Sequence, residues 1–240
     1  MMPESDAGRG RGRPRGTSAQ GRATREHLYT TAIRLIAERG WEATTLREVA
    51  AEAGVSVGLL YRYFPSKRAV LLAFYDQLSA EYAARAVQME RGSWRDRFLC
   101  ALRTSLAVLR PHRGTLSALA PILVGDAGDG LFAPGTAFSR LRVQQVFHEA
   151  VTGAADAPPP PIGAALGRLL YLLHLATILW WLMDRSPEQR ATDRLLTLAE
   201  QALPLASLGL RMRRVRALIV AADALVREAL FDDHAGKGHA

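Results

Sequence analysis

Residues 45–67 are T-L-R-E-V-A-A-E-A-G-V-S-V-G-L-L-Y-R-Y-F-P-S-K, a pattern that predicts two short helices joined by a tight turn. Thr45 and Glu48 are three residues apart, which predicts a capping box at the start of the first helix. The apolar residues of that helix recur at the spacing of a single helical face: Leu46, Val49, Ala50 and Ala53. Gly54 follows where a left-handed residue ends a helix, and Ser56 can cap the second helix.

The second helix has an inner and an outer face. Leu60 and Phe64 lie four residues apart and are expected to point inward. The outer face is then formed by Val57, Gly58, Tyr61 and Arg62. Two short helices joined by a turn that contains glycine form the helix-turn-helix unit, which places its second helix in the major groove of DNA. The alternative is an ordinary helical hairpin within an all-α domain.

A resemblance to a known family covers this region. Residues 32–71, A-I-R-L-I-A-E-R-G-W-E-A-T-T-L-R-E-V-A-A-E-A-G-V-S-V-G-L-L-Y-R-Y-F-P-S-K-R-A-V-L, are similar to the N-terminal domain of the TetR family of transcriptional regulators. The resemblance runs from Thr24 to about Arg85. Beyond that point it is one of architecture only. It implies an all-α protein, most simply a homodimeric repressor that a small apolar effector releases from a palindromic operator.

The resemblance also implies which residues contact DNA. Phosphate contacts are expected from Thr45, Ser56, Tyr61, Tyr63 and Lys67. Base edges are expected to meet Arg47, Val57 and Gly58, with Arg62 as a further candidate. One position departs from the family pattern: many members have histidine where Tyr63 stands, and either side chain can donate to a phosphate.

The chain is expected to have four parts. Residues 1–23 form a disordered basic arm, and residues 24–85 form the helix-turn-helix DNA-binding domain. Residues 86–232 form a helical domain for effector binding and dimerisation, and residues 233–240 form a frayed tail. The arm has no apolar periodicity and is built from Gly, Arg, Ser and Pro, a composition typical of disorder.

Within the arm, residues 10–16 are G-R-G-R-P-R-G, which resembles the core of an AT-hook. A narrow minor groove concentrates negative potential that attracts arginine. The candidates for such contacts are Arg9, Arg11, Arg13 and Arg15. A general attraction to phosphates would need the same residues, and both interpretations remain open.

Composition limits the classes of function. The chain of 240 residues has 31 Lys and Arg against 23 Asp and Glu, a net charge of +8 that favours an anionic partner. It has one cysteine, Cys100, which excludes an intramolecular disulfide; its setting F-L-C-A-L predicts a buried helical position. No secretion signal is apparent at the N-terminus, so a cytoplasmic protein is expected. The sequence lacks catalytic and phosphate-binding motifs, and its histidines lack the spacing of metal ligands, so we expect no enzyme, cofactor or metal site.

The remainder of the chain predicts successive helices and no strands. The most apolar is Ile162–Met183, for which a membrane span is the rival interpretation. Arg168 and His174 interrupt it, and a helix that is apolar all round is otherwise buried on both sides. The resemblance implies that a late helix of this kind faces the core on one side and a second subunit on the other. The next helix is expected to start at Pro187 after a cap at Ser186, to end before Pro204, and to complete a four-helix dimer interface.

A pocket for the effector is expected among the large side chains of this second domain. The candidates for its wall are Phe98, Phe147, Tyr171, His174, Trp180 and Trp181. His174 is the polar side chain expected to face the ligand, which should be apolar and either uncharged or weakly acidic. An ordinary core would use the same residue types.

Two classes of function follow. The first is a ligand-responsive, DNA-binding transcriptional regulator. The second is a helical small-molecule carrier or protein-interaction module without DNA readout. The outer face of the second short helix distinguishes them, because a carrier has no need for Gly58, Tyr61, Tyr63 and Lys67 together with a basic arm.

Overall fold

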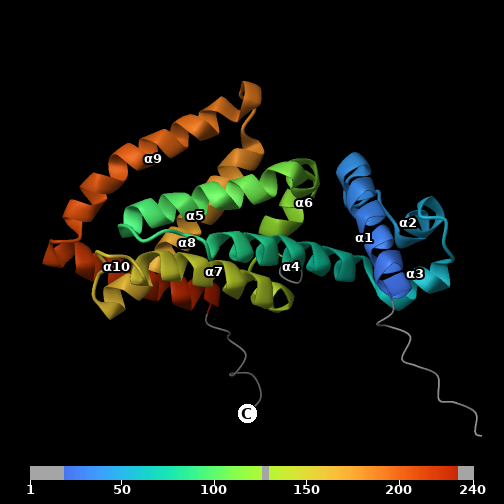
Figure 1. The fold of residues 1–240 in the computed structure, drawn as a ribbon, viewed down its shortest axis with the longest axis horizontal. Helices are drawn as coiled ribbons and strands as arrows, with labels where there is room; N and C mark the ends of the chain where they lie inside the picture. The colour runs from blue at the N-terminus through green and yellow to red at the C-terminus, as the bar shows by residue number, and fades with distance from the viewer. Residues whose placement is uncertain (1–18, 126–129, 232–240) are drawn as a thin grey trace, which may run out of the picture. The chain divides into compact units, whose positions relative to one another are not determined.

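A computed structural model describes residues 19–125 and 130–231, and every regular element in these two ranges is helical (Figure 1). The all-α prediction is therefore confirmed. The chain divides into two compact units, Met1–Val70 and Leu71–Ala240. The division falls within α4 (Lys67–Ala86), so this helix contributes residues to both units.

The first unit contains α1 (Ala19–Arg39), α2 (Leu46–Glu52) and α3 (Val57–Tyr63). Helix α1 begins at Ala19, so the prediction of a disordered arm is wrong for residues 19–23, which are the first residues of this helix. Its inner face packs on α2, and the two share a core with α3 that includes Leu35, Val49 and Leu60. This packing gives the short helices α2 and α3 the tertiary support that helices of their length need.

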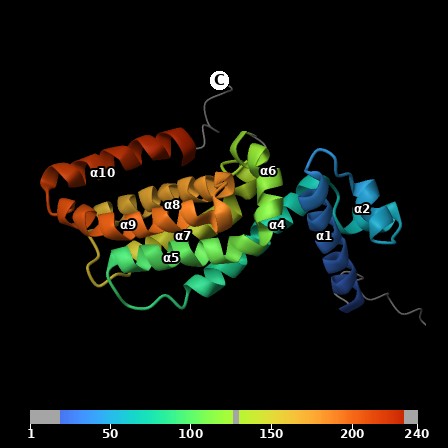
Figure 2. The ribbon, with the colours of Figure 1, turned by 90° about the horizontal axis from the view of Figure 1, so that it is seen from above.

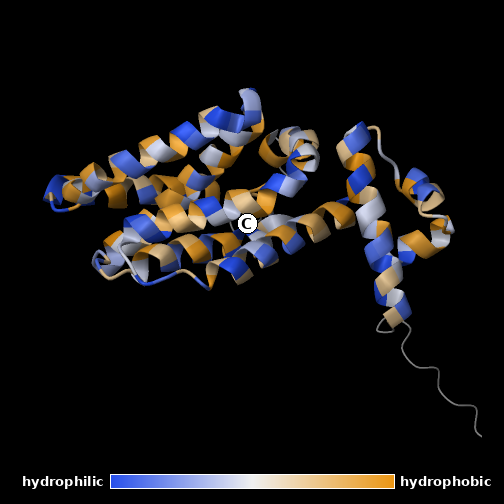
Figure 3. Ribbon diagram, turned by 45° about the horizontal axis from the view of Figure 1, so that its top comes forward, coloured by the Kyte–Doolittle hydropathy of each residue, from blue (hydrophilic) through white to orange (hydrophobic). Residues whose placement is uncertain are grey.

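The second unit contains the rest of α4 and six further helices in the described ranges. They are α5 (Trp94–Leu109), α6 (Arg113–Gly125), α7 (Ala137–Thr152), α8 (Pro160–Met183), α9 (Arg190–Gly209) and α10 (Arg213–Val226). Short 3₁₀ turns occur at Arg110–His112, Pro134–Thr136 and Pro187–Gln189, and a π turn occurs at Arg227–Phe231. Coloured by hydropathy, these helices carry both hydrophilic and hydrophobic residues, as amphipathic helices of a bundle do (Figure 3).

Helix α8 lies in the middle of this unit, with α7 and α10 beside it (Figure 2). It also contacts α5, α6 and α9. By length and composition α8 could cross a membrane, as the sequence suggested. Its side chains Tyr171, His174 and Trp181 are instead buried among the neighbouring helices, and this packing accounts for its apolar composition.

Three expectations about this unit are wrong. Pro204 lies inside α9, which continues to Gly209. A proline removes one backbone hydrogen bond, here to the carbonyl of Glu200, and both residues are exposed, so water can bind that carbonyl. Cys100 is exposed rather than buried, because it shares the outer face of α5 with Arg103.

The third correction concerns the turn into α9. Pro187 starts a 3₁₀ turn, and α9 itself begins at Arg190. The Ser186 hydroxyl still caps α9 by accepting from the N–H of Ala191 at 2.9 Å. Hydrogen bonds from Ser186 and Thr192 lower the pKa of the Asp184 carboxyl, and this carboxylate joins the end of α8 to the start of α9.

Candidate functional site

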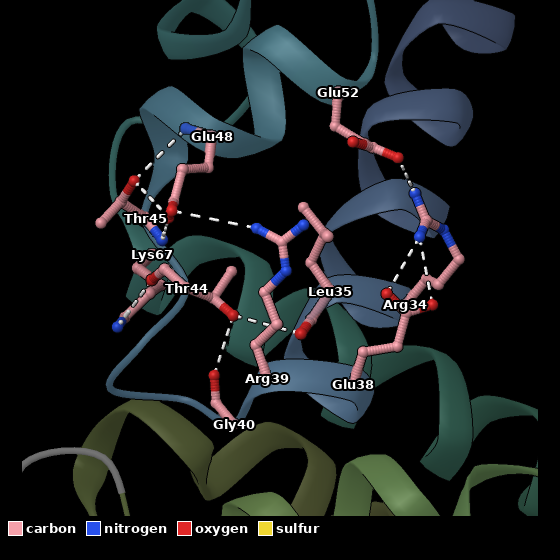
Figure 4. A network of polar contacts seen from close by, with 10 residues as sticks. All are labelled: Arg34, Leu35, Glu38, Arg39, Gly40, Thr44, Thr45, Glu48, Glu52 and Lys67. Atoms are coloured by element: carbon pink, nitrogen blue, oxygen red, sulfur yellow. Dashed lines mark hydrogen bonds and ion pairs between the residues drawn. The ribbon is translucent and has the colours of Figure 1, made fainter.

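The start of α2 has the predicted capping box (Figure 4). The backbone N–H and the hydroxyl of Thr45 both donate to Glu48 Oε2, each at 2.8 Å. The N–H of Glu48 donates to Thr45 Oγ1 at 3.3 Å. These hydrogen bonds from Thr45 lower the pKa of the Glu48 carboxyl. The box fixes where α2 begins and hence where the turn that follows it must lie.

The turn between α2 and α3 also follows the sequence-based prediction. Gly54 has φ +65°, in the left-handed region that favours glycine. Ser56 caps α3, because its Oγ accepts from the N–H of Leu59 at 3.2 Å. Leu60 and Phe64 point into the core of the first unit. The opposite side of α3 is therefore left to face solvent.

The outer face of α3 consists of Val57, Gly58, Tyr61 and Arg62, all exposed. Val57 is 37% exposed and Tyr61 45%, large values for side chains with so much apolar or aromatic surface. A Cβ atom built on Gly58 would meet no other atom within 4 Å. Internal packing therefore does not require glycine at this position. The face combines an aromatic hydroxyl, a cation and an open approach to the backbone, which suits a phosphate and base-edge surface.

The other residues expected at DNA lie around this face. Thr45, Arg47 and Ser56 are exposed, and Tyr63 is half-buried. The arm residues Arg9, Arg11, Arg13 and Arg15 lie outside the described residues. Their contact with the minor groove stays a prediction.

Lys67 is placed differently from a free surface cation. It is half-buried, and its Nζ donates to the carbonyls of Trp41 at 2.6 Å and Thr44 at 3.1 Å. The same ammonium lies 4.4 Å from the centre of the Trp41 ring, a cation–π contact. In the structure Lys67 thus holds the loop between α1 and α2 in place. Its contact with a phosphate stays a prediction.

A second set of polar contacts ties α2 to α1, and sequence reasoning missed it (Figure 4). Arg34 pairs with Glu52 at 2.5 Å and with Glu38 at 3.1 Å. Thr44 is 2% exposed, and its hydroxyl donates to the carbonyls of Gly40 at 2.8 Å and Leu35 at 3.2 Å. The i,i+4 spacing of Arg34 and Glu38 was visible in the sequence, but the contact with Glu52 depends on how α1 and α2 pack.

The second unit contains a cavity of about 150 Å³. Its wall is formed by residues of α4, α5, α6, α7 and α8 and of the segment before α7. Of the six residues predicted for this wall, Tyr171 and His174 line it. Sequence reasoning missed the contribution of α4, which includes Tyr75, Ser79 and Tyr82.

The other four predicted pocket residues do not line this cavity. Phe98 and Phe147 are fully buried and pack against each other with ring centres 6.0 Å apart. Trp181 is 1% exposed in the core, and its neighbour Trp180 is 49% exposed on the surface. Large aromatic residues in a helical bundle mostly fill space between helices, and adjacent helical residues point in different directions.

Three polar side chains of the cavity wall, His174, Tyr82 and Tyr171, are electrically neutral at neutral pH. His174 is 2% exposed, and burial lowers the pKa of its imidazole to about 3. Burial raises the pKa of the phenol groups of Tyr82 and Tyr171. Ser105 Oγ lies 2.7 Å from His174 Nε2. The ring centres of Phe147 and His174 are 4.7 Å apart. Such a site favours uncharged ligands.

Residues 19–125 and 130–231 contain no group of three or more His, Cys, Asp and Glu side chains that could hold a metal ion together.

Comparison with known proteins shows which protein family the first unit resembles. The family model for bacterial regulatory proteins of the tetR family matches residues 28–74, which run from within α1 into α4. The transcriptional repressor NemR of Escherichia coli is 36% identical over 97 residues, which are 39% of this chain and 48% of NemR. An uncharacterized regulator of Bacillus subtilis, YerO, is 47% identical over 49 residues, 20% of this chain and 17% of YerO. The chain therefore spans less than half the length of these curated relatives.

Solved structures extend the likeness to the whole fold. A tetR-family transcriptional regulator from Streptomyces coelicolor is 25% identical, with a TM-score of 0.61 over 84% of this chain and 90% of that one. One from Pectobacterium atrosepticum is 24% identical, with a TM-score of 0.56 over 81% of this chain and 97% of that one, and supports the fold alone. The helical second unit is thus of a kind found behind such N-terminal domains.

Proposed function

Since this chain belongs to the TetR family, a family of transcriptional regulators and not of enzymes, we propose that it is a sequence-specific DNA-binding regulator. It acts most simply as a homodimeric repressor in the cytoplasm. A small apolar effector releases it from a palindromic operator. The observation that carries the proposal is the outer face of α3, where a capped helix presents Tyr61 and Arg62 beside a glycine that internal packing does not require.

In the proposed complex, α3 lies in the major groove. The phosphate contacts come from Thr45, Ser56, Tyr61, Tyr63 and Lys67, and they provide affinity for any sequence. Arg47, Val57 and Gly58, with Arg62 beside them, approach the base edges and discriminate between sequences. The exposure of the α3 residues and of Arg47 supports this assignment.

The proposed dimer uses α8 and α9, each packed against its counterpart in the second copy. The exposed apolar side chains of these helices support it: Leu173, Leu179, Trp180 and Met183 on α8, and Leu198, Leu205 and Leu208 on α9. Exposed large apolar side chains that gather on one surface mark interaction sites on soluble proteins. A dimer would hold two α3 helices about 34–36 Å apart, one turn of DNA, so the operator should be a palindrome.

Release by an effector is proposed to act through α4. This helix begins at Lys67 beside the DNA-binding residues and contributes Tyr75, Ser79 and Tyr82 to the cavity wall. A ligand shifts an equilibrium only by its different affinity for the two states. The effector must therefore bind best when α4 is positioned so that α3 no longer fits the operator.

The test is binding of the full chain to DNA from upstream of its own gene. Binding is measured by gel shift and, in a salt series, by fluorescence anisotropy. Arg47→Ala should cost about 1–3 kcal/mol on the preferred site and little on unrelated DNA. Arg91→Ala, which removes the same charge from an exposed position between α4 and α5, is the matched control and should change neither affinity. Absence of binding to any upstream or random DNA fragment would favour the alternative, a helical carrier or interaction module.

A further inference from the structure

Two side chains of the cavity wall in the second unit, His174 and Ser105, are hydrogen-bonded to each other. Ser105 is 3% exposed, and its hydroxyl has no partner among the described residues other than His174 Nε2, at 2.7 Å. The hydroxyl proton has only this acceptor, so the arrangement that satisfies Ser105 has the hydroxyl donating to Nε2. The neutral imidazole then carries its own proton on Nδ1.

This assignment leaves a donor without an acceptor. His174 Nδ1 is buried and has no hydrogen-bond partner within the described ranges. Tyr82 Oη is also buried and has no hydrogen-bond partner within the described ranges. The rings of Tyr82 and His174 are stacked with centres 6.2 Å apart. Buried donors are nearly always paired in native proteins, and an exception calls for an explanation. Both residues line the cavity, so a molecule bound there is the simplest source of the missing acceptor.

We propose that the cavity binds an uncharged, largely apolar molecule whose carbonyl oxygen accepts a hydrogen bond from His174 Nδ1, with Tyr82 Oη as the second donor. This inference rests on the proposed function only in calling that molecule the effector. The size of the cavity, about 150 Å³, matches a body of one or two fused rings. Leucine and valine side chains such as Leu78, Val108 and Leu175 cover much of its wall.

Charge on the ligand is disfavoured by what surrounds it. The pKa of His174, lowered by burial, keeps the imidazole neutral and unable to pair with an anion. Among the described residues of the wall, Arg140 is the cation, and its Nη1 donates to the carbonyls of Leu131 at 3.0 Å and Ala133 at 3.2 Å. Its Nε is buried and has no hydrogen-bond partner within the described ranges, so Arg140 is the group of the wall that an anion would have to reach. A carboxylate placed against the neutral side chains of His174 and Tyr82 would lose its hydration without a charged partner in either of them. A ketone, ester or lactone has no charge and so does not incur this loss of hydration.

Three probes of one shape test the proposal: indane, 1-indanone and indane-1-carboxylate, titrated into the full chain at neutral pH by calorimetry. The ketone should bind about tenfold more tightly than the hydrocarbon, as expected for one buried hydrogen bond, and the carboxylate should bind most weakly. His174→Met keeps a side chain of similar size but has no hydrogen-bond donor, so it removes Nδ1. In this variant the ketone should lose most of its advantage while indane binds as before.

Two further variants complete the design. Tyr82→Phe removes only the second donor and should reduce the advantage of the ketone in part, which keeps the test valid if the His174 variant misfolds. Ser139→Ala removes a different polar group from the cavity wall and should leave the advantage unchanged.

The proposal is overturned if 1-indanone binds no better than indane, if the carboxylate binds most tightly, or if the folded protein binds none of the three at millimolar concentration. These measurements contain no DNA. A chain that prefers the ketone but never binds DNA would contradict the proposed regulator and leave the ligand assignment intact. A chain that binds DNA but shows no ketone preference would contradict the ligand assignment and leave the proposed regulator intact.

Discussion

Lys67 has two possible tasks, and they have different signatures. Its ammonium binds the carbonyls of Trp41 and Thr44, so Lys67→Ala should lower the free energy of unfolding by about 1–3 kcal/mol, as loss of a charged donor does. Urea denaturation measures this change. The side chain is also proposed to contact a phosphate, in which case the substitution weakens binding to every DNA sequence.

Salt dependence separates the two tasks of Lys67. Loss of a phosphate contact reduces the slope of log affinity against log salt by about one unit. Loss of the loop anchor alone weakens binding without changing that slope. Arg62→Ala, at an exposed position of α3, serves as a comparison because loss of an exposed side chain should change stability little. Unchanged affinity at every salt concentration would contradict the proposed docking.

His174 should make stability depend on pH. Burial lowers its pKa in the folded state to about 3, below the value of about 6.5 in an unfolded chain. The unfolded state therefore binds a proton that the folded state does not between these two values. Stability should be unaffected by this group above about pH 6.5 and should fall by up to about 1.4 kcal/mol per pH unit below it.

The matched variant for this prediction is His174→Gln, which cannot titrate. Its unfolding free energy, measured by urea denaturation at pH 7.5, 6 and 5, should decline less than that of the wild type. The neighbouring phenols of Tyr82 and Tyr171 have raised pKa values and stay neutral throughout this range. Equal declines in the two proteins would mean that His174 is protonated in the folded state.

At the scale of elements, α10 is held on α8 by a paired contact. Arg168 donates from Nε to Asp223 Oδ1 at 2.5 Å and from Nη2 to Oδ2 at 2.7 Å. The Asp223 side chain is only 7% exposed, and that of Arg168 is 32% exposed. Asp223→Ala should cost about 1–3 kcal/mol, less than for a fully buried pair because water reaches Arg168.

Hydrogen exchange gives this loss a location. In the Asp223 variant, amides of α10 should exchange faster while those of α7 stay protected, since α7 packs on α8 through other residues. The double variant with Arg168→Leu should recover part of the stability, because it removes the unpaired cation. A double variant no more stable than Asp223→Ala would show that the unpaired cation is not what destabilises the single variant.

At the scale of the whole molecule, the proposed dimer can be broken from outside the core. Leu198 on α9 is 61% exposed, and Leu198→Glu should shift the protein to monomer at micromolar concentration in sedimentation. Affinity for a palindromic site should fall to that for a half-site. Leu141→Glu on α7, where the side chain is 59% exposed, is the matched control. A monomeric wild type would contradict the dimer directly.

The basic arm is tested by deleting residues 2–16, which removes Arg9, Arg11, Arg13 and Arg15. Loss of up to four phosphate partners should reduce the salt slope by up to roughly three or four units. A larger loss of affinity on sites with A·T flanks than on G·C flanks would indicate contact with the minor groove. Equal losses would leave general electrostatic attraction as its role.

The sequence by itself determined the helix-turn-helix unit, because its signals are local. Thr45 caps through a residue three positions away, Ser56 does the same, and Gly54 adopts the left-handed conformation that its missing Cβ allows. Contacts at such short range depend on spacing alone. The periodicity of apolar residues likewise predicted an all-α chain, while Pro204 misled because an exposed helix tolerates the loss of one hydrogen bond.

Only the tertiary structure decided the cavity and the task of Lys67. Ser105 and His174 are 69 positions apart, and Lys67 and Trp41 are 26 apart. Whether such residues meet depends on the rotation of each helix about its axis, which packing against neighbouring helices sets. The same cause places Trp181 in the core and Trp180 at the surface, and exposes Cys100. Hydropathy does not distinguish these positions, because each stands in an equally apolar stretch of sequence.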